Sequence, residues 1–424
     1  MARRENERLK PKQAEKDAVL HRRDFLKMGV ASTGAFLALV KGKRAFADSS
    51  VGAEQNKEED RQPSALPKRR LGRTNLMVSV LAYGGAPLYE LDPSNPVPEP
   101  TVTKMLSRAM ERGLNFIDVS HMYGRGYVEN VFGKALKGRR DKVVIFSRCT
   151  LGRGASASKA LDESLRRLQT SHIDIYGMHG TWMSEDTADR FIEQLLPDLE
   201  KAKQAGKIGH IAATCHQAPT AMVKMLQTGK IDVVEMPVNP VWREFLEVVL
   251  PVAKKLDVGV VTMKAFWRGR LLSSAPELNS LLGATRREKV ASNLGFCLAQ
   301  DVASVSVGFV FEPEIDENIE VALGFRDLSE QQAKLLCPRG HDSVKDNCRV
   351  CNRCLPCPAR IDVPRVLRLE LYARHYGLTG WAKPEYRRLA TKADQCTKCG
   401  ECTKRCPYSI PAQELVLRAA QELA

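Results

Sequence analysis

Short apolar runs alternate with amphipathic stretches through the middle of the chain. Most of the runs are separated by segments with helical spacing of apolar residues, such as 102–112, 155–168 and 187–204. Continuous apolar runs are typical of buried parallel strands, and their alternation with helices favours a parallel sheet. Eight strand–helix units within residues 68–335 therefore predict an α/β fold, a (β/α)8 TIM barrel. The predicted strands are 78–83, 116–118, 143–146, 173–178, 208–213, 233–237, 258–263 and 305–307.

Polar residues follow several of these strands. Barrel enzymes carry their chemistry at the C-terminal ends of the strands. The residues there are Asp118, Tyr123, Arg148, His179 and Asn239, a set that can serve proton transfer to a carbonyl group. No Gly-x-Gly-x-x-Gly follows the first strand, which argues against an open dinucleotide-binding sheet.

Residues 1–47 have the organisation of a cleavable export signal. A polar, basic segment precedes an apolar run at 28–40, and Ala45 and Ala47 stand before Asp48. The run is shorter than the about 20 residues that span a bilayer, so we expect no stable transmembrane anchor. The pair Arg22-Arg23 predicts the twin-arginine pathway and a periplasmic or exported protein. The alternative is an amphipathic helix that stays in the mature protein.

Composition restricts the class of protein and its possible partners but does not indicate a function. Residues 48–67 are polar and charged and are predicted to be a linker. Hydrophobic residues make up 43% and charged residues 27% of the chain, which is typical of a globular protein. The net charge of +15 is explained by solubility and a basic signal, or by docking to an acidic redox protein or an anionic membrane surface. No nucleic-acid partner is predicted, because the basic residues are scattered.

Cysteines near the C-terminus form two runs. Cys396, Cys399, Cys402 and Cys406, followed by proline, have the spacing of a bacterial 4Fe-4S run. The run that comes earlier in the chain, Cys348, Cys351, Cys354 and Cys357, is one residue shorter in its last gap and also ends in proline. In two-cluster ferredoxins the fourth cysteine of each run ligates the other cluster. We therefore predict two clusters, one held by Cys348, Cys351, Cys354 and Cys406 and the other held by Cys396, Cys399, Cys402 and Cys357.

Residues 336–424 are predicted to form this small, α-rich, ferredoxin-like domain, with a helical pattern around 366–372. Structural zinc remains an alternative, although zinc sites usually use two separated cysteine pairs. Disulfides are a further alternative in an exported protein, but successive C-x-x-C steps suit them poorly. Elsewhere, Cys149, Cys215 and Cys297 are predicted to be small buried hydrophobic residues, and Cys337 to be structural.

The barrel motifs resemble the aldo-keto reductase family. The matching segments are 71–74, 116–118, 121–124, 133–136 and 173–179. The cysteine runs resemble the ferredoxin-type domain of an iron–sulfur subgroup of that family. The family resemblance implies a catalytic tetrad of Asp, Tyr, Lys and His.

Asp118, Tyr123 and His179 match three members of that tetrad, and Arg148 follows the strand where the family has its lysine. A cation beside a tyrosine lowers its pKa. Arg148 is expected to supply this charge without shuttling a proton, which puts ordinary carbonyl reduction in doubt. The alternative is that Asp118 and Arg148 form a structural ion pair, His179 is a core histidine and Tyr123 packs a loop.

The resemblance also implies NADP binding by the loops after the last strands. Candidate residues are Asn239, Lys264, Gly308 and Asn318. No clear basic pair for a 2′-phosphate stands there, and an exported enzyme has no obvious nicotinamide pool. NADP therefore stays open as a cofactor.

Together these patterns predict an exported oxidoreductase that passes electrons between 4Fe-4S clusters and a small-molecule substrate or cofactor at the barrel mouth, with a redox protein as partner. Two alternatives remain. One is an electron-transfer subunit with a non-catalytic barrel, and the other is an NADPH-dependent carbonyl reductase.

Overall fold

The computed structural model describes most of the chain from residue 65 onward, and all described residues belong to one compact unit. The predicted signal, the linker up to residue 64, Cys337 and Cys351 lie outside the described residues. The description covers 65–424 except 91, 151–156, 181–184, 217, 273, 275–278, 280–281, 327–347, 349–351 and 377–378.

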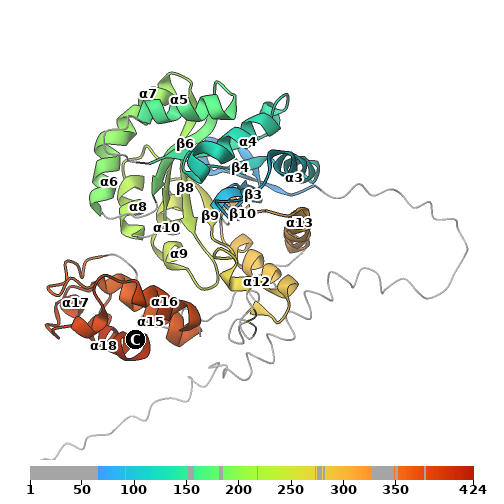
Figure 1. The fold of residues 1–424 in the computed structure, drawn as a ribbon. Helices are drawn as coiled ribbons and strands as arrows, with labels where there is room; N and C mark the ends of the chain where they lie inside the picture. The colour runs from blue at the N-terminus through green and yellow to red at the C-terminus, as the bar shows by residue number, and fades with distance from the viewer. Residues whose placement is uncertain are drawn as a thin grey trace, which may run out of the picture. The chain divides into compact units, whose positions relative to one another are not determined.

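Eight parallel strands close into a barrel, as the alternating pattern predicts (Figure 1). Neighbours around the barrel follow the chain, and the last strand, β10, pairs with the first, β3. All eight predicted strands are confirmed. They are β3 (Leu81–Gly84), β4 (Phe116–Asp118), β5 (Val144–Cys149), β6 (Ile173–Gly180), β7 (Ile208–Cys215), β8 (Val233–Pro237), β9 (Gly259–Met263) and β10 (Ser304–Gly308).

The first predicted strand is in fact two strands. β2 (Met77–Ser79) pairs antiparallel with β1 (Lys68–Arg70), and only β3 enters the barrel. The change of partner lies at Val80: its N–H still continues the hairpin by donating to the carbonyl of Pro67 at 3.0 Å, while its carbonyl accepts the N–H of Val305 in β10 at 2.9 Å. Val78 of β2 lies in one hydrophobic cluster with the first residues of β4, β5 and β8. The hairpin therefore covers the N-terminal end of the barrel and leaves the C-terminal end to the site.

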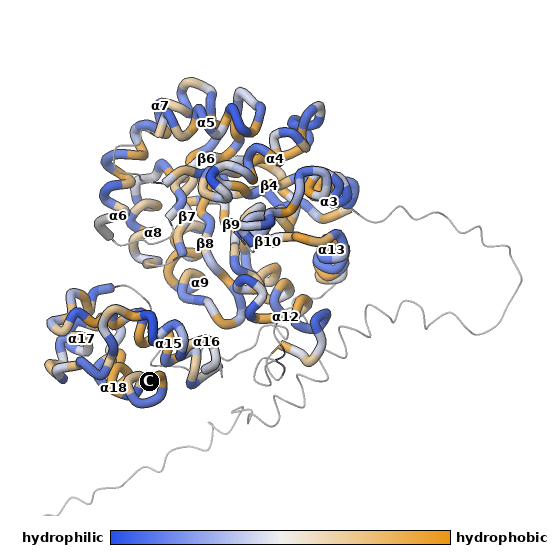
Figure 2. Tube along the Cα trace, in the orientation of Figure 1, coloured by the Kyte–Doolittle hydropathy of each residue, from blue (hydrophilic) through white to orange (hydrophobic). Residues whose placement is uncertain are grey.

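Helices surround the barrel, and Figure 2 shows hydrophilic and hydrophobic residues alternating along them. The predicted helix 187–204 is interrupted by a π-helical turn at Phe191–Leu195, just before Pro197, which lacks an N–H for regular bonding. The helices are α2 (Pro87–Glu90), α3 (Glu99–Glu111), α4 (Tyr127–Ala135), α5 (Ala157–Leu168), α6 (Glu185–Arg190), α7 (Leu196–Gln204), α8 (Pro219–Leu226), α9 (Glu244–Val248), α10 (Leu250–Lys255), α12 (Arg286–Leu298) and α13 (Glu312–Arg326).

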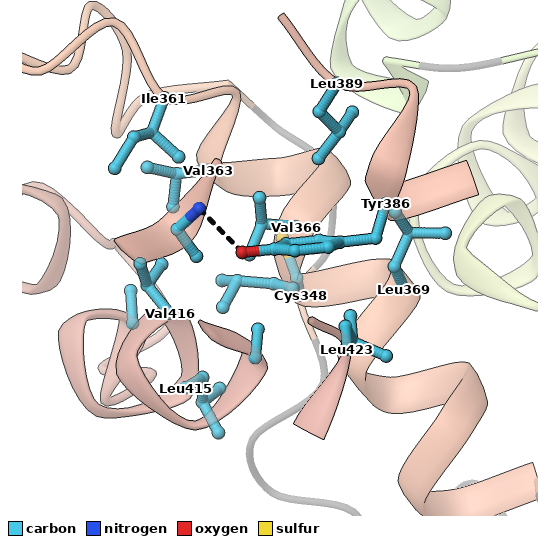
Figure 3. Close-up of a cluster of buried hydrophobic side chains, with 14 of the residues drawn as sticks. Cys348, Ile361, Val363, Val366, Leu369, Tyr386, Leu389, Leu415, Val416 and Leu423 are labelled. Carbon is cyan, nitrogen blue, oxygen red and sulfur yellow. Dashed lines mark hydrogen bonds between the residues drawn. The ribbon is translucent and has the colours of Figure 1, made fainter. Parts of the chain in front are cut away.

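The cysteine-rich domain is helical in its described part, as predicted. Its core is formed by buried side chains from α15 (Val363–Tyr376), α16 (Thr379–Arg387) and α18 (Ala412–Glu422). Figure 3 shows Tyr386 at the centre of this core, with its hydroxyl accepting the backbone N–H of Ala393 at 2.9 Å. That bond holds the short turn that leads into the second cysteine run. Among the residues described, none of the helices has the length and hydropathy needed to cross a bilayer.

Candidate active site and cluster site

A buried network of charges crosses the C-terminal end of the barrel. Arg148, inside β5, forms ion pairs with Asp118 at the end of β4 and with Glu235 in the middle of β8. The hydroxyl of Ser306 on β10 donates to the second oxygen of Asp118. Four strands thus contribute one residue each, and the arginine and both carboxylate side chains are at most 5% exposed.

The network gives Arg148 a role different from that of a free cation. Two carboxylates share its charge, and its guanidinium lies 4.2 Å from the centre of the Phe146 ring. Burial lowers the pKa of Arg148 while Glu235 raises it, and arginine stays protonated in proteins. A buried charge is tolerable only when it is paired in this way. The ion pair between Asp118 and Arg148, which was one alternative from the sequence, is therefore present, and Glu235 is a second carboxylate partner of Arg148.

His179, near the end of β6, faces a pair of aromatic neighbours. Its Nδ1 lies 2.8 Å from the hydroxyl oxygen of Ser120. The ring of Tyr123 meets it edge-on at 5.6 Å between centroids, and the ring of His216 stacks on it at 6.4 Å. Burial, with Arg148 next, holds the pKa of His179 well below its ordinary value. Burial also lowers the pKa of His216 to about 3, so both imidazoles are neutral at pH 7.

The pKa of Tyr123 is shifted in the direction opposite to the one expected from the sequence. It opens a short 3-10 turn, Tyr123–Gly126, in which Gly124 has a φ of +61° and a Cβ would lie 2.5 Å from the Tyr89 ring. Burial, followed by the charges of Glu235 and Glu90, raises the pKa of Tyr123 well above 10. The expectation that Arg148 lowers this pKa is not met, because burial is the largest cause of the shift and the cation that lowers this pKa is Arg268. Tyr123 is a neutral phenol, suited to donating a hydrogen bond rather than a proton.

Lys264 and Asn239 lie together on the barrel rim. The Asn239 side-chain amide donates to the carbonyl of Lys264 at 2.9 Å, and its oxygen accepts the N–H of Trp242 at 2.8 Å. Lys264 has a φ of +65°, a strained backbone conformation of the kind found at functional sites. Burial, with Arg268 next, lowers the pKa of Lys264 to about 8. Lys264 is thus a group that exchanges a proton close to neutral pH.

The two other predicted cofactor residues have structural explanations. A Cβ on Gly308 would lie 2.2 Å from the Pro87 side chain, so glycine lets α2 pack against the end of β10. Asn318, within α13, donates its amide to the carbonyl of Glu314 at 2.6 Å. The binding of NADP by Gly308 and Asn318 stays a prediction.

Sequence reasoning missed Glu235, Ser306 and His216. Glu235 is a charged residue inside an otherwise apolar predicted strand, and that interruption was a usable signal. His216 directly follows β7 and therefore satisfies the rule that the ends of barrel strands carry function. Ser306 offered no such signal, because serine is common on strands.

Residues of both cysteine runs line one small hollow. Cys354 and Cys357 of the first run face Cys396, Cys399 and Cys402 of the second, and apolar residues such as Ile361 and Val416 complete the wall. Thiolates are the ligands of iron–sulfur clusters, so this donor set fits such a group. Cys406 is partly buried, outside the residues lining the hollow. Cys348 is 8% exposed within the domain core, close to Val366 and Tyr386 (Figure 3).

Two further observations concern single metal ions and the cysteines outside the two runs. Among the described residues, no three His, Cys, Asp or Glu side chains form a group ready to hold a single metal ion. Cys149, Cys215 and Cys297 are fully buried in the barrel, as predicted for small hydrophobic residues.

Sequence comparison assigns both parts of the chain. Residues 80–327, more than half of the chain, match the Aldo/keto reductase family. Residues 347–410 match the 4Fe-4S dicluster domain.

Among curated proteins, L-galactose dehydrogenase of Arabidopsis thaliana is 28% identical over 63% of this chain and 91% of its own length. The uncharacterized oxidoreductase YqkF of Bacillus subtilis is 29% identical over 64% and 95%.

Among solved structures, the holo form of aldo-keto reductase AKR11C1 from Bacillus halodurans is 25% identical, with a TM-score of 0.53 over 64% of this chain and 96% of that chain. An aldo/keto reductase from Klebsiella pneumoniae in complex with NADP and acetate is 20% identical, with a TM-score of 0.52 over 64% and 94%, and shows the shared fold. The chain is therefore an oxidoreductase that belongs to the aldo/keto reductase family and carries an iron–sulfur domain behind its barrel.

Proposed function

We propose that this protein is an exported oxidoreductase that passes electrons between 4Fe-4S clusters and a small-molecule substrate at the barrel mouth. One observation carries the proposal. Cysteines from both runs line one hollow, in the same compact unit as a barrel whose mouth holds a buried, charge-paired site.

The hollow supports crosswise ligation. Cys357 lines it together with Cys396, Cys399 and Cys402, the set predicted for the second cluster, and Cys354 of the other set lines it as well. The first cluster would then use Cys348, Cys351, Cys354 and Cys406. A 4Fe-4S cluster, once bound, supplies or accepts one electron at a time, so a redox protein partner must deliver or remove electrons.

The barrel residues would bind and orient the substrate. Neutral Tyr123 donates a hydrogen bond to a substrate oxygen, and His179, held at Nδ1 by Ser120, leaves Nε2 for a second contact. Asp118, Arg148 and Glu235 are buried and paired with one another, so they would support the site rather than bind the substrate. Lys264, with a pKa of about 8, is the group best suited to exchange a proton as the substrate changes charge. A substrate with a carbonyl or related oxygen fits these donors.

Visible and electron paramagnetic resonance spectra of anaerobically purified protein, with an iron count, test the proposal. We expect about eight iron atoms per chain, four for each cluster. Colourless protein that holds zinc or no metal would end the proposal.

Substrate turnover separates the enzyme from a carrier with an inactive barrel. Tyr123→Phe should abolish turnover while the clusters are still reduced normally. Unchanged turnover would favour the electron-transfer subunit.

Export rests on the sequence alone. Replacing Arg22 and Arg23 together by lysine should retain the protein, with its clusters, inside the cell. Fractionation of cells that express each form measures this, and continued export of the variant would contradict the proposal.

NADPH-dependent carbonyl reduction is the second candidate, since related structures from Klebsiella pneumoniae contain NADP or NADPH. The raised pKa of Tyr123 makes it the weaker one, because a tyrosine acid must readily lose its proton. Quenching of protein fluorescence by micromolar NADPH would favour this candidate, and its absence would count against it.

A further inference from the structure

Helix α15 of the cysteine domain packs on two loops of the barrel. Leu371 and Tyr372 of α15 share one hydrophobic cluster with Trp242 and Trp267. The ring centroids of Trp267 and Tyr372 are 4.9 Å apart, and those of Trp242 and Trp267 are 6.0 Å apart. Trp242 follows β8 and Trp267 follows β9, so the contact lies at the C-terminal end of the barrel, where the site is.

Arg368 of α15 adds polar contacts to this packing. Its guanidinium is 4.5 Å from the centre of the Trp242 ring, and it donates to the Tyr372 hydroxyl at 3.0 Å. Its Nε is 4.0 Å from a carboxylate oxygen of Glu244, the first residue of α9. The side chains of Arg368 and Glu244 are only 11% and 2% exposed, so the pair lies within the contact rather than at its edge.

The two loops under α15 are joined at the backbone of Lys264. The carbonyl of Lys264 accepts the N–H of Trp267 at 2.8 Å and the side-chain amide of Asn239 at 2.9 Å. The oxygen of the same Asn239 side chain accepts the N–H of Trp242 at 2.8 Å. Both tryptophans that contact α15 are therefore tied to Lys264, one directly and the other through Asn239.

The loop after β9 has a strained backbone. Lys264, Trp267 and Arg268 have φ angles of +65°, +45° and +55°, and none of them is glycine. Such conformations persist only where the surrounding structure imposes them. Arg268 pairs with Glu90 at 2.7 Å, but its side chain is 55% exposed, and exposed pairs hold a loop weakly. Packing of the buried Trp267 ring against Tyr372 supplies a stronger constraint.

We propose that α15 completes the barrel site, with Trp242, Trp267 and Tyr372 as positioning residues that hold the loops after β8 and β9 in the conformation that encloses Lys264. The inference rests on the proposed function for the proton-exchanging role of Lys264. The cysteine domain then has a structural task in the barrel besides electron transfer, because the state of Lys264 depends on whether α15 is docked.

The proton affinity of Lys264 reports this docking. Burial, with Arg268 next, lowers the pKa of Lys264 to about 8. Loss of α15 from the loops would admit water and let Arg268 move away, and both changes raise the pKa. The charged and titratable side chains that interact with Lys264 or surround it in the site are Glu90, Arg148, His179, His216, Glu235 and Arg268. None of these side chains belongs to α15, so a variant of Tyr372 changes the docking and leaves them in place.

The experiment uses the full-length protein with its clusters. Acetylation of Lys264 by acetic anhydride, followed by mass spectrometry over a range of pH, reports its pKa, because only the neutral amine reacts. In Tyr372→Ala we expect the midpoint to rise from about 8 to about 9 or higher. Amide hydrogen exchange at Trp242 and Trp267 should accelerate about tenfold or more. Tyr372→Phe keeps the ring and should restore most of both values.

Two further variants separate docking from other effects. Glu244→Gln acts from the barrel side, since it removes the carboxylate that pairs with Arg368, and should raise the midpoint in the same direction. Tyr408→Ala replaces a tyrosine of the cysteine domain that is 42% exposed, and this matched control should change neither measurement. The visible spectrum of each variant verifies that its clusters are retained.

Wild-type midpoints in both Tyr372→Ala and Glu244→Gln would overturn the inference, as would a wild-type protein whose Lys264 titrates at the ordinary value of 10.5. Absence of iron from the wild type would instead overturn the proposed function, and the midpoints would still test the docking.

Discussion

The barrel site and the cysteine domain are built in opposite ways. In the barrel, Arg148 is already surrounded by its partners, Asp118 and Glu235, and all three are buried. In the cysteine domain five of the predicted ligands line a hollow, and one of them, Cys399, is exposed. The charges of the barrel network are therefore paired by the protein's own side chains, whereas a cysteine site gains its binding free energy only with metal.

The contrast shows two sources of stability. A barrel of this size buries enough apolar surface to hold an ion network in place. A small domain has a smaller core and depends more on linked metal binding, which stabilises only the folded state. The following variants test this contrast, from the largest expected effect to the smallest.

Cys396→Ala should have the largest effect. It removes a thiolate from the hollow, so we expect loss of the spectrum and iron of at least one cluster, and cooperative unfolding of the cysteine domain at lower denaturant concentration. Circular dichroism and an iron count measure both. Cys297→Ala, inside the barrel, is the control and should leave the iron content unchanged. Full iron content in Cys396→Ala would remove this cysteine from the ligand set.

Arg148→Met should lower the free energy of unfolding of the barrel by about 3–5 kcal/mol, because it leaves two buried carboxylates without a cation. Urea unfolding followed by a barrel signal measures the loss. Arg140→Met, which breaks the more exposed pair with Asp174, should cost about 1 kcal/mol or less. Equal losses in the two variants would show that the buried network contributes no more to the free energy of unfolding than the more exposed pair does.

Lys264→Met should stabilise the barrel at pH 7. The folded pKa of Lys264 is lowered from 10.5 to about 8, so the buried ammonium is unfavourable below pH 8, and stability is regained as the pH rises from 8 to 10.5. The gain at pH 7 is at most about 3 kcal/mol and should disappear near pH 10.5. Unfolding at both pH values measures it, with the exposed Lys255→Met as control. A pH-independent difference would argue against a lowered pKa.

Glu235→Gln should have the smallest effect on stability, because Arg148 keeps Asp118 as a partner. It should lower the pKa of Tyr123, since a negative charge that opposes the phenolate is removed. The alkaline absorbance change of phenolate, compared with that of the double variant Glu235→Gln/Tyr123→Phe, isolates Tyr123. Glu90→Gln should act in the same direction but more weakly. An unchanged Tyr123 titration would show that burial alone sets this pKa.

Much of the fold could be predicted because its signals are local. The eight strands and the spacing of the second cysteine run depend on residues close together in the chain, and hydrophobic periodicity reports such order directly. The split of the first strand at Val80 was missed, because an apolar run does not show where hydrogen bonding changes partner. For the same reason the π-helical turn at Phe191–Leu195 was missed.

The sequence alone determined which residue types were present for the chemistry: Asp118, Tyr123, Arg148 and His179 after or within strands, and two proline-terminated cysteine runs. Only the tertiary structure decided their electrostatics. Glu235 is 87 positions from Arg148 in the chain, and closure of the barrel brings the two together. Burial, with the charge of Glu235 next, raises the pKa of Tyr123 instead of lowering it. Arg368 likewise reaches Trp242 only through packing between domains. Charges act through space and through the exclusion of water, and neither is encoded by spacing along the chain.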